Sequence, residues 1–123
     1  MREDQYVATG TIPMLEDTIR KIESRIQGTE ALSDEKRREL LQLLGRLKGE
    51  VADLSRTHGE QAESIAGFTE RSAHEATRAQ QDSKLLNLSL EGLSSSVAGF
   101  EQTHPRLVQV VNAISSTLSN LGI

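Results

Sequence analysis

The sequence has no cysteine and no tryptophan, and aromatic residues make up only 2% of its 123 positions. Without thiols the chain can form neither disulfides nor zinc-thiolate sites, and thiol catalysis and thiol-based redox sensing are excluded. Tyr6, Phe68 and Phe100 are the only tyrosine and phenylalanine side chains. Any hydrophobic core must therefore be built from leucine, isoleucine, valine and alanine.

Long apolar runs are also missing. No stretch approaches the roughly 18–20 apolar residues that a membrane-spanning helix needs, and the polar start Met1–Gln5 is not followed by the apolar region of a secretory signal. Alternating β-branched residues, which mark half-buried strands, do not occur either. We therefore expect a cytoplasmic protein that neither contacts membranes nor contains a β-sheet.

An excess of positive charge is missing as well, since 14 lysines and arginines face 18 acidic residues. The net charge is -4 and the sequence pI is near 5.4, which disfavours binding to a phosphate backbone. The densest basic cluster, Lys36–Arg38, lies between Asp34, Glu35 and Glu39. This mixture of signs indicates a solvated helix face, so no nucleic-acid partner is expected.

The aliphatic residues that are present recur at alternating spacings of four and three. A period of about 3.5 is typical of helices with heptad, coiled-coil-like packing. With short connections between them, four such rows predict an all-α, up-and-down helical bundle. The rows are Leu15, Ile19, Ile22 and Ile26; Leu40, Leu44, Leu47, Val51 and Leu54; Leu86, Leu90, Leu93, Val97 and Phe100; and Leu107, Val111, Ile114, Leu118 and Leu121.

Further leucines flank two of the rows: Leu41 and Leu43 beside the second, and Leu85 and Leu88 beside the third. They indicate that these helices contact more than one neighbour, and one small bundle is not expected to bury them all. Small residues continue the pattern between the two rows, at Ala62, Ile65, Ala66, Thr69, Ala73, Ala76 and Ala79.

Residues 1–12 are polar and lack helical periodicity, so we expect an N-terminal extension followed by one helical domain at 13–123. Pro13 suits a first helical turn, Gly28 suits a helix end, and Ser33 suits an N-cap. One glycine costs only about 1 kcal/mol inside a helix. Hence the residues from Ser33 to Ala79 fit two alternatives. One is a single helix of roughly 70 Å, which the other, shorter helices could not cover and which would therefore favour packing with a second chain. The other is a pair of helices separated at His58-Gly59.

Three later boundaries are predicted. The polar segment Gln80–Ser83 reads as a turn with a capping residue. His104-Pro105 should end the helix of the third row, because a residue before proline is pushed out of helical geometry. Pro105 then opens the last helix, for which Gly122 is the C-terminal cap candidate.

The C-terminal part resembles an uncharacterised bacterial family, domain of unknown function 4404. The similarity lies in Phe100-Glu101-Gln102-Thr103-His104-Pro105, Asn112-Ala113-Ile114, Leu118 and Asn120-Leu121-Gly122-Ile123. Residues 15–44 resemble the family's N-terminal half, whereas residues 51–80 look like extra length. The resemblance implies a small helical protein and supplies no active site.

Glu101 and His104 are the strongest candidates in the sequence for metal ligands. In di-iron bundles a Glu-x-x-His motif projects both side chains to a metal, but such a site needs a second copy, which only a dimer would supply. The alternative is a local pair in which His104 caps a helix end.

Four weaker features have plainer explanations. Glu70, His74 and Glu75 fit exposed ion pairing with Arg71 and Arg78. His58 continues the second row as a half-buried residue or a pH-sensitive junction. Gly45-x-x-x-Gly49 fits a solvent face, and Ser94–Ser96 and Ser115-Ser116 fit polar faces.

These observations predict no enzyme, no cofactor and no catalytic or metal site. We expect a helical interaction module that self-associates through the aliphatic rows, as a dimer or small oligomer. Two alternatives stay open: a carboxylate–histidine metal-binding bundle, and a small adaptor that binds the helix of a partner protein.

Overall fold

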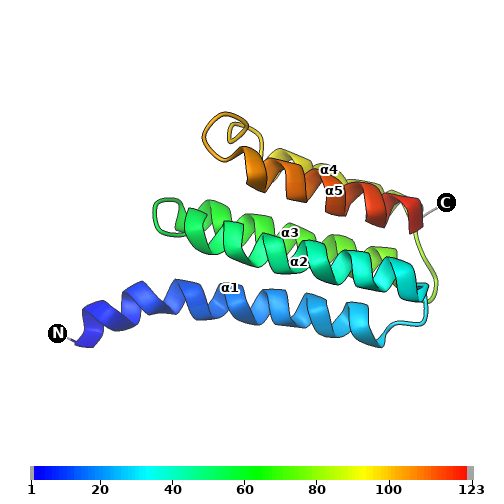
Figure 1. The fold of residues 1–123 in the computed structure, drawn as a ribbon, viewed down its shortest axis with the longest axis horizontal. Helices are drawn as coiled ribbons and strands as arrows, with labels where there is room; N and C mark the ends of the chain where they lie inside the picture. The colour runs from blue at the N-terminus through cyan, green and yellow to red at the C-terminus, as the bar shows by residue number, and fades with distance from the viewer. Residues whose placement is uncertain (1, 122–123) are drawn as a thin grey trace.

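The computed structural model describes the backbone of residues 2–121 and the side chains of residues 14–121. The described chain is all-helical, as predicted, and contains no strand. Successive helices run in opposite directions (Figure 1). The helices are α1 (Arg2–Gly28), α2 (Asp34–Leu54), α3 (Gly59–Ala76), α4 (Ser83–Ser96) and α5 (Pro105–Leu121). Coiled-coil character of their contacts stays a prediction.

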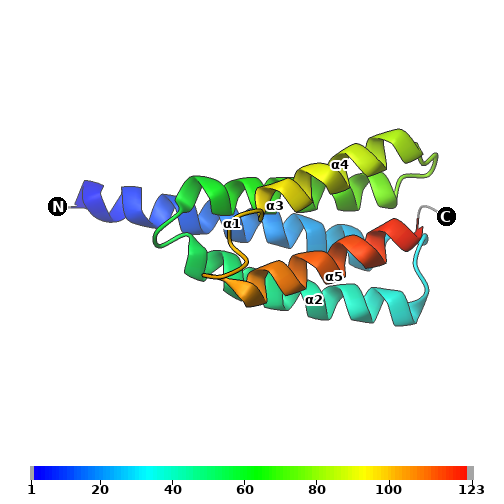
Figure 2. The ribbon, with the colours of Figure 1, turned by 90° about the horizontal axis from the view of Figure 1, so that it is seen from above.

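The helices form three layers. The α2–α3 hairpin lies in the middle, α1 covers one of its faces, and the α4–α5 hairpin covers the other (Figures 1 and 2). Accordingly α1 contacts α2 and α3, whereas α5 packs on α2 and α4 packs on α3. The four helices α2–α5 therefore make a bundle, and α1 is an added outer helix.

The aliphatic rows form a single core, as their spacing predicts. Every member of the first and second rows is buried, and the fourth row is buried except for Leu121, which is half-buried. In the third row Leu86, Leu93 and Val97 are buried, whereas Leu90 and Phe100 are half-buried against the core. The chain therefore hides its own rows, and they leave no long seam open for a second chain.

Helix α3 occupies the centre, in contact with all four other helices. Its inward positions are mostly small: Ala62, Ala66, Thr69, Ser72, Ala73 and Ala76 are buried. Small side chains let neighbouring helices approach closely from several sides, which explains why this helix carries few leucines. Ala79 lies beyond the helix and is exposed, so it does not belong to the buried face.

A larger side chain at the centre of the bundle should destabilise the fold. We expect Ala66→Leu to lower the free energy of unfolding by about 1–3 kcal/mol, because the added carbons have no room between packed helices. Ala66 is 1% exposed. Urea denaturation followed by circular dichroism measures the effect, with Ala79→Leu at the exposed position as the matched control. Equal stability of the two variants would contradict a crowded centre.

Several predicted boundaries are confirmed. Helix α1 ends at Gly28 and α5 begins at Pro105. Ser33 is the N-cap of α2, with its Oγ accepting a hydrogen bond from the Lys36 amide at 3.1 Å. Asp82 is the capping residue of the turn before α4, accepting from the amides of Lys84 and Leu85.

Two boundary predictions are corrected, and one alternative that the sequence left open is decided. Helix α1 begins at Arg2, so Pro13 lies inside it; the cost of an interior proline does not stop the helix there. The chain turns between Leu54 and Gly59, so a helix pair forms and the single long helix does not. Helix α4 ends at Ser96, well before Pro105, because Gly99 turns the chain with a φ of 96°. The division at residue 12 stays a prediction, and Gly122 lies outside the described residues.

The Lys36–Arg38 cluster is not simply a solvated face. The Arg37 guanidinium donates hydrogen bonds to the carbonyl oxygens of Ile26 (2.7 Å) and Thr29 (2.8 Å) through Nη1, and of Leu32 (3.1 Å) through Nη2. A longer contact reaches the Gln27 carbonyl at 3.3 Å. Arg37 thus satisfies carbonyl groups that the end of α1 leaves without helical partners, and it fastens the α1–α2 connection.

The two hairpins of the bundle repeat each other in sequence. Each matched residue recurs 46 positions further on: Leu40, Leu44, Leu47, Val51 and Thr57-His58 are followed by Leu86, Leu90, Leu93, Val97 and Thr103-His104. The turn of α2–α3 and the turn of α4–α5 lie at the same end of the bundle (Figure 1). The bundle therefore consists of two related helical hairpins packed turn to turn.

Candidate functional site

The outer stripe of α4 carries leucines that the bundle does not cover. Asp82 fixes the start of the helix, and Leu86, Ser89 and Leu93 then point into the core. Leu85 and Leu88 lie on the neighbouring stripe, where they are 40% and 62% exposed. The prediction that one small bundle would leave flanking leucines unburied is confirmed for this pair, whereas Leu41 and Leu43 are half-buried.

Phe68 of α3 extends this apolar surface across the helix pair. Its side chain is 40% exposed, and it lies directly against Gly92 of α4: a Cβ atom added at Gly92 would come within 2.4 Å of the ring. Gly92 therefore provides the space in which the ring rests. We call Phe68, Leu85 and Leu88 the apolar face.

Charged residues of both signs border the apolar face. Lys84 and Glu91 are exposed, one turn before and one turn after Leu88 on α4. The stripe Leu85, Leu88, Gly92 and Ser95 has spacings of three, four and three, which is the heptad pattern of helices that pair side by side. This surface can therefore accept another helix.

Glu75 on α3 is more buried than an exposed ion pair would be. The residue is 4% exposed, and its carboxylate contacts Arg78 at 2.8 Å and Arg71 at 3.7 Å. The hydrogen bond that Arg78 donates to Glu75 raises the pKa of that guanidinium above its usual value. The predicted pairing with Arg71 and Arg78 is thus confirmed for Glu75 alone, and Glu75 is buried where an exposed position was predicted. The arginines neutralise a buried charge, which suits a structural role.

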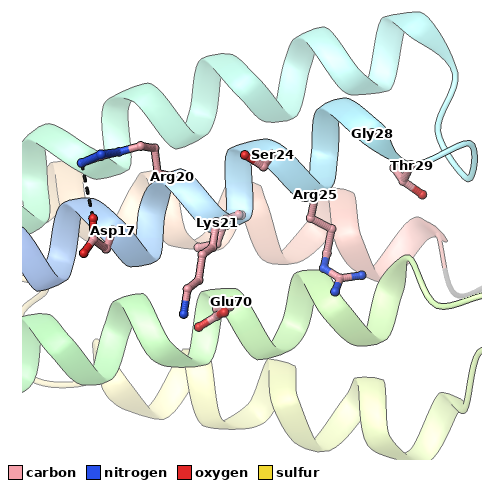
Figure 3. A pocket seen from close by; sticks show the side chains of 9 residues that line it. Asp17, Arg20, Lys21, Ser24, Arg25, Gly28, Thr29 and Glu70 are labelled. Carbon is pink, nitrogen blue, oxygen red and sulfur yellow. Dashed lines mark ion pairs between the residues drawn. The ribbon is translucent and has the colours of Figure 1, made fainter.

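A groove between α1 and α3 is lined mainly by charged side chains (Figure 3). Arg20 pairs with Asp17 at 3.6 Å along α1, and Lys21 points across the groove toward Glu70 of α3. Three cationic and two anionic side chains line it, so the groove has no single sign that would select a charged ligand.

A second polar groove lies between α4 and α5, on the face turned away from the α2–α3 hairpin. Its lining combines Ser94, Ser115, Ser116 and Ser119 with Asn87, Asn120, Leu90 and Glu91. Neither serine cluster predicted to lie on a polar face forms part of a nucleophile–base pair among the described hydrogen bonds. Gly45 and Gly49 likewise face open space.

Glu101 and His104 are not brought together. The Glu101 carboxylate accepts a hydrogen bond from the Gly99 amide at 2.9 Å, whereas His104 packs edge-on against Phe100 and His58. The prediction of a local Glu101–His104 pair is therefore wrong, and so is the prediction that His104 caps the end of α4. Helix α4 ends earlier, and His104 lies just before α5. Between residues 14 and 121, no three His, Asp or Glu side chains gather closely enough to hold a metal ion.

Helices long and apolar enough to cross a membrane are absent from the described part of the chain. A family model, Domain of unknown function (DUF4404), matches residues 40–123. The chain belongs to this family. No curated protein and no solved structure matches it.

The DUF4404 match covers most of α2 and all of α3, α4 and α5. The match includes residues 51–80, which the resemblance in sequence had suggested to be extra length. It leaves out residues 15–39, which had been assigned to the family's N-terminal half. The DUF4404 region thus corresponds to the two repeated hairpins, and α1 lies outside it. The apolar face belongs wholly to the matched region.

Sequence reasoning found Leu85 and Leu88 but missed Phe68 as their neighbour, because nothing in the α3 pattern indicates that Gly92 would lie beside it. It also missed the meeting of His58 with His104. The repeated Thr-His dipeptide, 46 residues apart, was the available signal.

Proposed function

We propose that the DUF4404 domain is a non-enzymatic interaction module that forms a dimer through its apolar face. The observation that carries this proposal is the exposure of Phe68, Leu85 and Leu88 on the two adjacent helices α3 and α4. Among the side chains of residues 14–121, Met14 on α1 is the other large apolar residue with high exposure, at 60%. Contiguous exposed apolar residues are typical of protein interaction sites.

The charges beside the face favour a second copy of the chain as the partner. In a two-fold dimer each surface meets itself, and with the axis perpendicular to α4 the two copies of this helix run antiparallel across the interface. If the axis passes near Leu88, Lys84 of one copy lies opposite Glu91 of the other, because these residues flank Leu88 at similar distances along the helix. Leu88 then packs beside its own counterpart at the axis with heptad-type contacts.

Analytical ultracentrifugation across micromolar concentrations tests the dimer. We expect the wild-type chain to dimerise, and Leu88→Lys to remain monomeric while keeping its helical circular dichroism. Met14→Lys is the matched control: it changes an equally exposed apolar residue away from the face, and it should still dimerise.

Charge reversal tests the antiparallel arrangement. Lys84→Glu and Glu91→Lys should each weaken dimerisation, because each places like charges opposite one another, and the double variant should restore it. A strictly monomeric wild-type chain would refute self-association, and capture of a foreign helix by the same monomer would favour the adaptor alternative. A Leu88→Lys variant that still dimerises would place the interface elsewhere.

A further inference from the structure

The two hairpin turns place two histidines next to each other. His58 immediately precedes α3, and His104 immediately precedes α5. Each carbonyl accepts the first helical hydrogen bond, from Ala62 at 3.0 Å and from Val108 at 3.2 Å. The two histidines therefore occupy equivalent positions in the repeated hairpins.

The rings form a compact cluster with Phe100 between them. The ring centres of His58 and His104 are 6.3 Å apart, and each lies about as close to Phe100, at 5.4 and 5.5 Å. Both histidines are half-buried. Because each ring packs edge-on against Phe100, both imidazoles are held in place while keeping access to solvent.

Both imidazoles are also oriented in the same way. Nδ1 of His58 is 2.7 Å from the Thr57 hydroxyl, and Nδ1 of His104 is 3.0 Å from the Thr103 hydroxyl. When Nδ1 carries the proton and donates it to the hydroxyl oxygen, Nε2 presents its lone pair outward. Metal-binding histidines are commonly oriented by such a hydrogen bond from the other ring nitrogen. Within residues 14–121, neither Nε2 atom has a recorded hydrogen-bond partner.

We propose that His58 and His104 bind one transition-metal ion, such as Zn²⁺ or Ni²⁺, between their Nε2 atoms, with water completing the coordination. With metal–nitrogen bonds of about 2.0–2.1 Å, the centres of two imidazole rings that share one ion lie about 5 Å apart at a tetrahedral angle and about 6.4 Å apart when the two nitrogens are opposite one another. The observed separation of 6.3 Å fits two opposite ligands of an octahedral ion such as Ni²⁺, and a tetrahedral Zn²⁺ would draw the rings about 1 Å closer together. The bound ion joins the turn of the α2–α3 hairpin to the turn of the α4–α5 hairpin.

The surroundings select the class of ion. The N-termini of α3 and α5 both point toward the site, and their partial positive charge disfavours a cation held by electrostatics alone. Calcium and magnesium prefer several oxygen ligands, whereas imidazole suits zinc, nickel and copper. Zinc, nickel and copper ions should therefore bind at this site, whereas Ca²⁺ and Mg²⁺ should not.

The test uses the full chain without a histidine tag. We expect Zn²⁺ to raise the thermal unfolding midpoint and to give one binding site per chain in calorimetric titration. His58→Gln and His104→Gln should each weaken binding tenfold or more, whereas His74→Gln, which changes the third histidine of the chain, should bind as the wild type does. Thr57→Val should weaken binding by about tenfold, because the His58 ring loses the hydrogen bond that orients it.

Histidine ring signals in the NMR spectrum of the wild-type chain provide a readout that needs no variant. Zn²⁺ should perturb the His58 and His104 rings together and leave His74 unchanged. Binding no tighter to the wild type than to the double variant His58→Gln/His104→Gln would overturn the proposal. Perturbation of only one of the two rings would also overturn it. The dimer test involves none of these residues, so either proposal can fail alone.

Discussion

Arg37→Met is expected to lower the free energy of unfolding by about 2–4 kcal/mol. The guanidinium donates hydrogen bonds to carbonyl oxygens of α1 and of the α1–α2 connection. The two shortest of these bonds go to Ile26 and Thr29. Hydrogen bonds from a charged donor contribute about 1.5–3 kcal/mol each, and partly buried carbonyls left without a partner add a desolvation cost. Methionine keeps the aliphatic part of the side chain and removes only the donors.

Urea denaturation of the full chain measures this effect. Arg38→Met is the matched control, because the neighbouring residue is exposed and has no recorded side-chain partner among the described residues. The control should change stability by less than about 0.5 kcal/mol, as surface substitutions usually do. Similar losses in both variants would show that Arg37 does not fasten α1 to α2.

Leu93→Ala is expected to destabilise the chain by about 2–5 kcal/mol. Leu93 is completely buried, and truncating a buried leucine loses its transfer free energy and leaves a cavity. Leu88→Ala on the same helix is the matched comparison. Its side chain is 62% exposed, so the monomer should lose little stability.

Chemical denaturation at low protein concentration separates the two leucines, because dimerisation does not contribute there. The outcome to look for is a large loss for Leu93→Ala beside a small one for Leu88→Ala. A reversed order would mean that α4 is rotated about its axis relative to the structure.

The helices and their buried faces were predictable because local rules determine them. Rows spaced by three and four residues identify the inward side of each helix. Ser33 marks a helix start because its side chain accepts from an amide of the first turn, and Gly28 stands at the end of α1. The same spacing was misleading at Val97 and Phe100. Both continue the row and contact the core, but they lie beyond the end of α4 at Ser96, so apolar periodicity alone overestimated the length of α4.

The features that were missed depend on contacts between distant segments. Lys36–Arg38 looks like a solvated cluster from its neighbours in sequence, and only the return of the chain places the α1 carbonyls beside Arg37. Phe68 joins the exposed leucines only because α4 lies antiparallel to α3 with Gly92 against the ring. The meeting of His58 and His104 follows from the 46-residue repeat, which becomes informative once the two hairpins are known to pack with their turns together.

The groove between α4 and α5 also affects whether a further helical hairpin could pack on the bundle. On the α2–α3 hairpin the corresponding outer side is covered by α1 and its isoleucines. On α4–α5 it is lined by serines and asparagines, with Leu90 as the one apolar contributor. Another helix laid there would displace water from hydroxyl and amide groups while burying little hydrocarbon. This surface therefore resembles the polar outer side of a capping repeat in a solenoid, and it disfavours the packing of a further hairpin on this side of α4 and α5.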